Sequence, residues 1–594
     1  MASNTNTCGF RLPWWQLNPK AAEGAKRHRK EQLLESIDNR VFYLDEVASH
    51  EAQRSVVSYP SDYPLLAGTQ PDLYRCFMTR TWELVSADGA IGLIHPESHL
   101  TEKAAIQLRI QTYRRLRRHF QFINELKLFE ITDRATFGVH IYSSPQTPDF
   151  VQLTSLYHPE TALRSFAHDG SGPLPAIKNP AGGWDLRPHK DRITHINLDV
   201  LKTWASLNGD EVSDWASTKM LYFLNSEVAA AGEKLAGTPR LKSIPYNWTT
   251  GWHETADRKK GYFQPESTVP DSLDQLLILG PHFSLNCPFY RTSNPTMKNN
   301  QDYTLLDLET LPRTFIPRTN YKLLLPEEEA LQRYPRWEDL LSGEEAPSNN
   351  SFTIAFRHMV GPAAFRTLMP CIFPPKLRHL FTVVTTELSN EMLTVLNGGL
   401  WTSLPVDFFI KVSGASHMIR GVCETLPVVD ANHPLAPELL LRTLRLNCLT
   451  ADFADLWEEL YDPAWQEDTW VPGITTNRYD QPALGDIGPK WTMETPLRLA
   501  QDRRQAQVEI DAIAAIMLGL DADDLDAIYT TQFQVLKQNY EDKTIYDPHG
   551  RQMDGDELKA HLDAGTTPDG YARVDRQHDM RLAYEHFTQK MSQH

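Results

Sequence analysis

The stretch that decides the fold runs from residue 63 to residue 142. It begins YPLLAGTQPDLYRCFMTRTWELVSADGAIGLIHPESHL (residues 63–100) and ends RRLRRHFQFINELKLFEITDRATFGVHIY (residues 114–142). Its order is an amphipathic helix, a glycine turn, a buried strand, a charged helix, a second strand, an acidic turn and a third strand. This alternation of strands and helices predicts an α/β unit.

Hydrophobic spacing places the elements inside this unit. Apolar residues recur at helical spacing and predict one helix with a packed face and outward-pointing arginines: Ile106, Ile110, Tyr113, Leu116 and Phe120. The segments FQFINELKLF (120–129) and ATFGVHIYS (135–143) are rich in aromatic and β-branched residues, so both predict strands.

The bulk composition is that of a globular chain with several domains. It has 594 residues, 59 basic and 76 acidic, and a net charge of −17, which argues against a protein that coats polyanions generally. A local basic stripe still permits DNA binding. Six scattered cysteines without a CxxC pair favour a reducing cytoplasm over a disulfide scaffold or zinc ribbon. The N-terminal MASNTNTCGFRLPWW lacks a signal-peptide core, and no apolar run predicts a membrane span.

Changes in proline, glycine and charge content along the chain predict five segments. They are an N-terminal helical segment for partner contact (1–62), the α/β unit (63–155), a mixed β and loop insertion (156–345), a second mixed α+β domain (346–432) and a helical C-terminal region (433–594). Within the last, QVEIDAIAAIMLGLDADDLDAIY predicts a helical hairpin that turns at Gly519.

The α/β unit resembles the second half of the catalytic domain of N6-adenine DNA methyltransferases of the γ-like class. The pattern is a helix with Tyr74 and Phe77, then Gly89, Ile94 and Pro96, then a helix with a basic face. The family is that of type IIG restriction–modification enzymes and the methyltransferases of phage-defence systems such as BREX and DISARM. The resemblance implies a partial Rossmann-like methyltransferase unit, with strand-end loops as the place for ligands.

The resemblance also implies candidate site residues. Phe137, with Phe129 second, matches the aromatic position that stacks on an adenine flipped out of the duplex; a core aromatic is the competing interpretation of each. The cluster Arg114, Arg115, Arg117 and Arg118 could neutralise DNA phosphates. A merely solvated face is the competing interpretation there.

Residues 346–432 resemble the target-recognition domains of type IIG enzymes and type I specificity subunits. The matching residues are Arg366, Thr367, Leu368, Pro374, Pro375, Leu396, Asn397, Asp407, Phe408, Leu426 and Pro427. We expect them to be scaffold, with bases read by polar side chains of neighbouring loops.

Two motifs of the family are missing from the sequence. No (Asn/Asp/Ser)-Pro-Pro-(Tyr/Phe/Trp) tetrapeptide occurs, and the near misses at 286–289 and 462–465 each break a required proline. HDGSGPLP (168–175) mimics a glycine-rich donor loop, but prolines follow where a helix should start.

Metal chemistry has weak sequence support. His189, His253, Glu254 and His282 lack a metal-binding spacing, and Asp191, Glu254 and Asp257 form no convincing nuclease pattern, so the sequence predicts no metal site.

The favoured hypothesis is therefore a split enzyme. A second subunit would carry the S-adenosylmethionine pocket and the NPPY-type loop, and this chain would complete the sheet, stack on adenine and recognise double-stranded DNA in the cytoplasm. A sheet half left with an open edge needs a partner. The alternatives are a non-catalytic DNA-binding adaptor of a defence complex, a self-sufficient divergent methyltransferase and a defence nuclease component.

Overall fold

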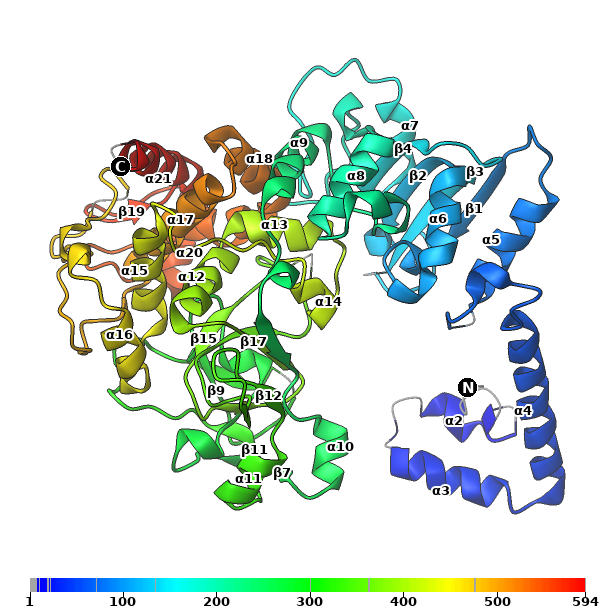
Figure 1. Cartoon of the computed structure of the whole chain (residues 1–594), viewed down its shortest axis with the longest axis horizontal. Coiled ribbons are helices and arrows are strands. Elements are labelled where there is room, and N and C mark those ends of the chain that lie inside the picture. The colour runs from blue at the N-terminus through cyan, green and yellow to red at the C-terminus, as the bar shows by residue number, and fades with distance from the viewer. Residues whose placement is uncertain are drawn as a thin grey trace. The chain divides into compact units, whose positions relative to one another are not determined.

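The computed structural model describes residues 8–592, apart from residues 10, 19, 20, 22, 71, 134, 300, 362, 363, 475 and 476. The first seven residues of the predicted N-terminal segment therefore lie outside the described part. The chain forms two compact units, one of residues 1–152 with 195–198 and one of residues 153–194 with 199–594. Both mix helices and strands (Figure 1), which confirms the predicted α/β class.

A five-stranded sheet with the order β1-β3-β2-β4-β5 lies mostly in the first unit. Its strands are β1 (Ile91–His95), β2 (Leu116–Ile123), β3 (Thr136–Tyr142), β4 (Asp149–Leu156) and β5 (Thr194–Asn197). Strand β3 lies between β1 and β2 and is antiparallel to both. It follows that β1 and β2 run in the same direction, with the helix α6 (Ile106–Arg115) between them in sequence.

The predicted helix over residues 106–120 was too long. Helix α6 ends at Arg115, and Leu116 begins strand β2. Both Leu116 and Phe120 satisfy the helical spacing, but a register shift between Leu116 and Arg118 places them on opposite faces of β2, with Leu116 opposite Tyr142 and Phe120 opposite Val139. Phe120 pairs with Val139 of β3, and this tertiary pairing makes the segment after Arg115 a strand and not a continuation of the helix.

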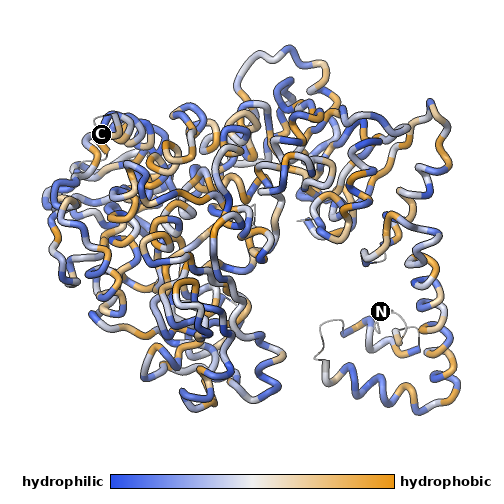
Figure 2. The backbone as a smooth tube through the Cα atoms, viewed as in Figure 1, coloured by the Kyte–Doolittle hydropathy of each residue, from blue (hydrophilic) through white to orange (hydrophobic). Residues whose placement is uncertain are grey.

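One long helix near the N-terminus carries large apolar residues that remain exposed. Helix α4 (Ile37–Val57) has no buried residue, and Ile37, Val41 and Leu44 are exposed on it at helical spacing. The hydropathy colours of Figure 2 show orange segments along this helix. Helix α3 (Glu23–Leu33) precedes it. Packing within the chain therefore contributes little to the stability of α4.

The second unit is built on a smaller sheet with the order β15-β14-β17-β6. Its strands are β6 (Tyr246–Thr249), β14 (Thr353–Arg357), β15 (Cys371–Phe373) and β17 (Val383–Leu388). Helix α12 (Glu391–Trp401) packs on three of them. Helix α12 can lie this close to its neighbours only with glycine at two positions. A Cβ at Gly398 would lie 2.7 Å from Ile372 Cδ1, and one at Gly399 would lie 2.0 Å from Thr443 Oγ1.

Short elements precede and follow this sheet. In the insertion region they include α7 (Pro159–Ser165), α8 (Leu198–Leu207), α9 (Ser226–Lys234), α10 (Glu254–Lys259), β7 (Phe263–Thr268), β11 (Thr319–Leu323) and α11 (Glu327–Arg333). The predicted helical C-terminal elements are confirmed as α15 (Ala436–Asn447), α16 (Ala454–Leu460), α17 (Ala500–Met517), α18 (Ala522–Gln532) and α19 (Gln534–Asn539), followed by α21 (Arg576–Met591). The turn at Gly519, whose φ is +76°, ends α17 as expected.

The residues that match target-recognition domains form a buried framework. The Asp407 carboxylate pairs with Arg366 and accepts hydrogen bonds from the backbone N–H groups of Thr367 and Leu368. Asn397 exchanges two hydrogen bonds with the Val429 backbone. These groups are buried and bonded to one another, and their expected role as scaffold of a target-recognition domain stays a prediction. The five-segment division itself stays a prediction.

We expect Asp407→Ala to destabilise the second unit by about 3–5 kcal/mol, because the change leaves the buried Arg366 guanidinium without its counter-charge. Denaturant unfolding followed by circular dichroism measures this. Asp569→Ala, at an exposed aspartate, is the control and should change stability by less than about 0.5 kcal/mol. Equal stability of the two variants would contradict the framework role.

Candidate functional site

A polar network surrounds the loop that follows β1. Helix α5 (Leu73–Leu84) begins at the N-cap Asp72, whose side chain accepts from the Tyr74 N–H. The Tyr74 hydroxyl lies 3.0 Å from Ser98 Oγ, and the buried Arg75 donates to the same Ser98 oxygen at 2.8 Å. Tyr74 was one of the residues behind the family resemblance. The helix and the loop are thus joined by side chains, as a site built on the strand end would need.

Aromatic and imidazole rings form a stack beneath this loop. The rings of His95 and His140 are parallel with centroids 4.0 Å apart, and Tyr74 stacks on His95 from the other side at 5.2 Å. The His95 ring is fixed at both nitrogens, by the Pro96 carbonyl at 2.7 Å and by the Tyr142 hydroxyl at 3.0 Å. The sequence predicted the strand but not this stack.

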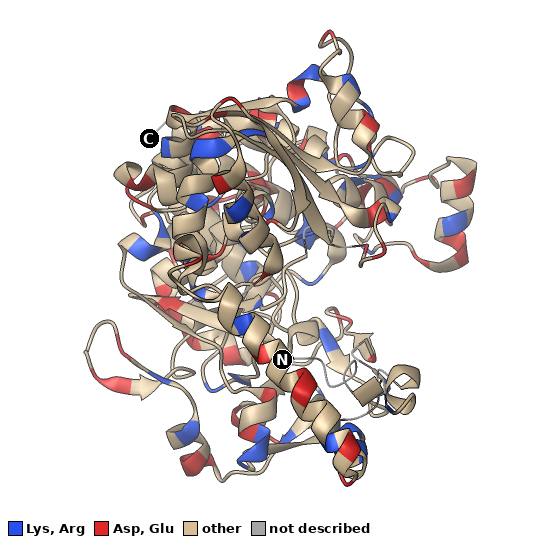
Figure 3. Ribbon diagram, turned by 90° about the vertical axis from the view of Figure 1, so that its right-hand side faces the viewer, with Lys and Arg blue, Asp and Glu red and all other residues tan. Residues whose placement is uncertain are grey.

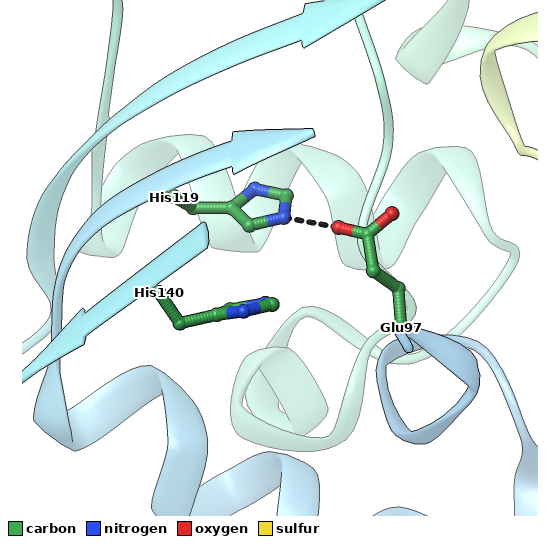
Figure 4. A group of neighbouring side chains, drawn as sticks. All are labelled: Glu97, His119 and His140. Carbon is green, nitrogen blue, oxygen red and sulfur yellow. Dashed lines mark hydrogen bonds and ion pairs between the residues drawn. The ribbon is translucent and has the colours of Figure 1, made fainter. Parts of the chain in front are cut away.

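Glu97, His119 and His140 converge within the sheet (Figure 4). Their potential ligand atoms all lie within 4.8 Å of one another, and all three residues are buried. The Glu97 carboxylate hydrogen-bonds His119 Nε2. His119 and His140 are direct cross-strand partners in the β2–β3 register, so their side chains leave the same face of the sheet. Among the described residues, this is the group with the side chains and spacing of a metal site.

Burial keeps the imidazoles of His95, His99 and His140 neutral. It lowers the pKa of His95 to about 4 and lowers the pKa values of His99 and His140 well below the ordinary value. The neighbouring charged and imidazole groups add to the lowering for His99 and His140. At neutral pH these rings therefore offer lone pairs, which is the form in which histidine binds a metal or accepts a proton.

The residues expected to stack on adenine lie on the opposite face of β3. Phe137 is only 7% exposed, stacks on Phe122 with centroids 5.4 Å apart and meets the edge of Phe129 at 4.9 Å. Phe129 is 44% exposed. Since strand side chains alternate, Phe137 points away from the face that holds His140. Base stacking on Phe137 would first require Phe129 to move aside.

The arginine cluster is divided between α6 and β2. Arg114 and Arg118 are exposed. Arg115 lies over the Trp82 ring at 5.0 Å and bonds Gln111, while Arg117 donates to the Ser144 carbonyl at 2.6 Å. In Figure 3 basic and acidic residues are interspersed over the ribbon. Phosphate contacts would therefore involve a few basic side chains and not a broad basic surface.

The weaker sequence candidates are held in structural roles. Asn286, in the near miss at 286–289, is buried and its amide bonds Thr402 and Gln507. His282 is buried, with its ring nitrogens near the Leu279 and Arg318 backbone. The two histidines and the carboxylate of the Glu97, His119 and His140 group, in contrast, come from the α/β unit. Sequence reasoning missed them because the histidines stand singly in separate strands and become neighbours only through the β2–β3 register.

The donor implied by the resemblance, S-adenosylmethionine, does not fit the residues present. A glycine-rich loop between a strand and a helix N-terminus would hold it. In the described sheet, the links from β1 to the turn at 98–100 and from β4 to α7 contain no glycine, and β5 leads directly into α8. Gly170 and Gly172 of HDGSGPLP have φ of 90° and 87°, but they follow helix α7 and not a strand.

No protein-family model and no curated protein matches this chain. Among solved structures, it is similar to the type IIG restriction endonuclease BpuSI, at 11% identity and a TM-score of 0.22, over 76% of this chain and 50% of that one. It is also similar to the type IIL restriction-modification enzyme MmeI in complex with DNA, at 9% identity and a TM-score of 0.30, over 82% and 55%. This chain thus spans about half the length of each. At these TM-scores neither likeness supports an argument about this chain.

In the part of the chain that the structure describes, no helix is both long and apolar enough to cross a membrane.

We expect Gly138→Ala to disrupt the cluster, because its Cβ would lie 2.2 Å from His140 Cε1 and 2.9 Å from Glu97 Oε1. Overpacking of this kind costs about 1–3 kcal/mol in thermal unfolding. Gly92→Ala is the matched control in the adjacent strand, where the nearest atom, Ile141 Cδ1, is 3.5 Å away. Equal stability of both variants would contradict the packing described.

Proposed function

We propose that this chain is the DNA-recognition and half-catalytic subunit of a split adenine-specific DNA methyltransferase in a restriction–modification or phage-defence system. A second polypeptide would supply the S-adenosylmethionine pocket and the NPPY-type loop. The observation that carries the proposal is the unpaired outer edge of β1, which is also the strand whose sequence resembles these enzymes.

Strand β1 is the open edge. It pairs with β3 on one side, and no described strand pairs with its other side. Its sequence, Ile91–His95, has no Lys, Asp or Glu to discourage pairing, and Ile94 is 58% exposed. Edge strands of self-contained proteins are usually blunted by charge, proline or a covering element. An uncharged and partly apolar edge is what a strand from another polypeptide would extend.

Helix α5 strengthens this inference because it contacts β1 and carries an exposed apolar stripe. Leu73, Phe77 and Leu84 lie at i, i+4 and i+11 on one face and are 62%, 65% and 80% exposed. Three large apolar side chains on one helix face are unusual on a surface that stays in water. Helix α5 covers the sheet face that carries His95 and Tyr142, so this exposed stripe lies next to the edge strand and points away from the sheet.

The missing chemistry fits the same arrangement. The chain offers no strand–glycine loop–helix unit in the described part of its sheet, and Asn286 of the near-miss tetrapeptide is occupied in the core. This chain lacks a donor pocket and an NPPY-type loop, and it presents an open strand edge. We therefore expect a partner polypeptide to supply the pocket and the loop and to pair with this edge. The exposed Arg114 and Arg118 would then contact DNA phosphates.

The first experiment is reconstitution with the polypeptide that carries the donor and NPPY-type loops, sought in the neighbouring open reading frame. Neither chain alone should transfer a labelled methyl group to DNA adenine, and the mixture should. Phe77→Asp with Leu84→Asp should lower the association constant at least about 100-fold, because two charges would be buried against apolar surface. Leu341→Asp, at a residue 76% exposed in the second unit, is the control. Methyl transfer by this chain alone would refute the split enzyme.

The adenine-stacking role of Phe137 and Phe129 has its own test. In the reconstituted enzyme, Phe137→Ala and Phe129→Ala should each lower kcat more than DNA affinity, because stacking replaces the neighbours that a flipped base loses. Stacking is worth about 1–3 kcal/mol per base, so a loss of roughly 5- to 150-fold is expected. Phe137→Leu separates packing from stacking. Unchanged kcat in both alanine variants would remove these residues from the site.

The non-catalytic adaptor is the second candidate, favoured by the absence of a donor loop in the described sheet. It predicts that DNA binds to the complex but that labelled methyl groups are never transferred. A self-sufficient enzyme predicts that the isolated chain binds S-adenosylmethionine in calorimetry.

A further inference from the structure

We propose that Glu97, His119 and His140 bind one divalent transition-metal ion of the zinc class, which cross-links strands β2 and β3 to the loop after β1. The three residues come from three separate segments that the sheet brings together. This inference does not depend on the methyltransferase proposal.

The donor set and its spacing are those of a metal site. Two imidazoles and one carboxylate are ligands that Zn²⁺ and similar ions accept, with metal–ligand distances near 2.0–2.2 Å. Ligands around one ion at such distances stand about 3–4 Å apart, and the atoms here lie within 4.8 Å of one another. Metal binding would replace the Glu97–His119 hydrogen bond and bring the three ligand atoms to this common spacing.

Unsatisfied polar atoms are the second, independent observation. His140 is fully buried, and neither of its ring nitrogens makes a hydrogen bond of normal geometry with the described residues, although the Gly138 backbone lies close. Glu97 Oε2 is also buried without a partner. Each such group costs about 1–3 kcal/mol. A bound cation satisfies the imidazole and the carboxylate at once, whereas a hydrogen bond among these three residues leaves His140 unsatisfied.

The residues around the Glu97, His119 and His140 cluster leave room for it and support its orientation. Gly138 is opposite His95 in the β1–β3 register, and its missing Cβ leaves the space that the His140 ring and the Glu97 carboxylate occupy. Gln152 lies on the far side of His119, with Nε2 3.3 Å from His119 Nδ1. When His119 binds a metal through Nε2, its proton resides on Nδ1, and the Gln152 amide can turn to accept it through oxygen. That arrangement is the usual outer partner of a metal-bound histidine.

The position indicates a structural role. The ligands lie in the interior of the unit, on the two central paired strands and at residue 97, directly after the edge strand. An ion there would hold the HPESHL loop against the sheet and so fix the end of β1 that the partner is proposed to extend. The stability of the unit should therefore depend on the metal.

The test uses the full-length chain, stripped with a chelator and titrated with Co²⁺ as the spectroscopic probe. One equivalent should bind, give visible d–d bands and raise the melting temperature, and Zn²⁺ should displace it. His140→Ala and Glu97→Ala should weaken Co²⁺ binding more than about 100-fold, and Gln152→Ala about 10–100-fold. His253→Ala, at an exposed histidine, should leave binding unchanged.

The outcomes separate a site from adventitious binding. Circular dichroism checks that each variant folds, and Glu97→Gln provides a variant of the same shape if the alanine change unfolds the chain. Co²⁺ binding that survives in both the His140 and the Glu97 variants would overturn the proposal, since surface histidines would then be responsible. So would the absence of d–d bands and of any metal-dependent melting shift in the natural chain.

Discussion

Antiparallel pairing of β3 with both β1 and β2 is the interaction on which the first unit depends. It aligns His140 with His119 on one side and with Leu93 on the other. The same register places Phe137 opposite Phe122 on the reverse face. One set of backbone hydrogen bonds thus forms the imidazole cluster, the aromatic cluster and the free outer edge of β1. The site and the docking edge are consequences of a single strand order.

The second unit is stabilised in a different way. Its helices are joined by buried ion pairs: Arg442 bonds Glu509 and Asp468, and Arg576 bonds Asp511 and Glu541. Buried pairs of this kind contribute little net stability compared with apolar residues, but removing one partner costs much. They fix which helix faces which. A framework of this type suits a unit whose exposed loops are proposed to contact DNA.

Local sequence patterns were sufficient for some elements of the fold, although the strand expected over 120–129 ends at Ile123. The strands at 91–95 and 136–142 and the helical hairpin around Gly519 follow from periodicity and turn residues. The end of α6 does not follow from periodicity, because Leu116 and Phe120 satisfy the helical spacing and only the pairing of β2 with β3 selects the strand. The cluster of Glu97, His119 and His140 was also not predicted from the sequence. His119 and His140 are 21 positions apart in the sequence, and only the cross-strand register makes them neighbours.

The central claim is that β1 is completed by a strand from another polypeptide, and hydrogen exchange at the backbone amides of Ile91–His95 tests it most directly. In the isolated chain, alternate amides of this strand face the open edge and should exchange quickly, while β3 between its two neighbours stays protected. Adding the polypeptide with the donor loop should protect the β1 amides by at least about tenfold and leave the second-unit sheet unchanged. Protection of all β1 amides in the isolated chain, or no change when the two chains bind, would contradict the account.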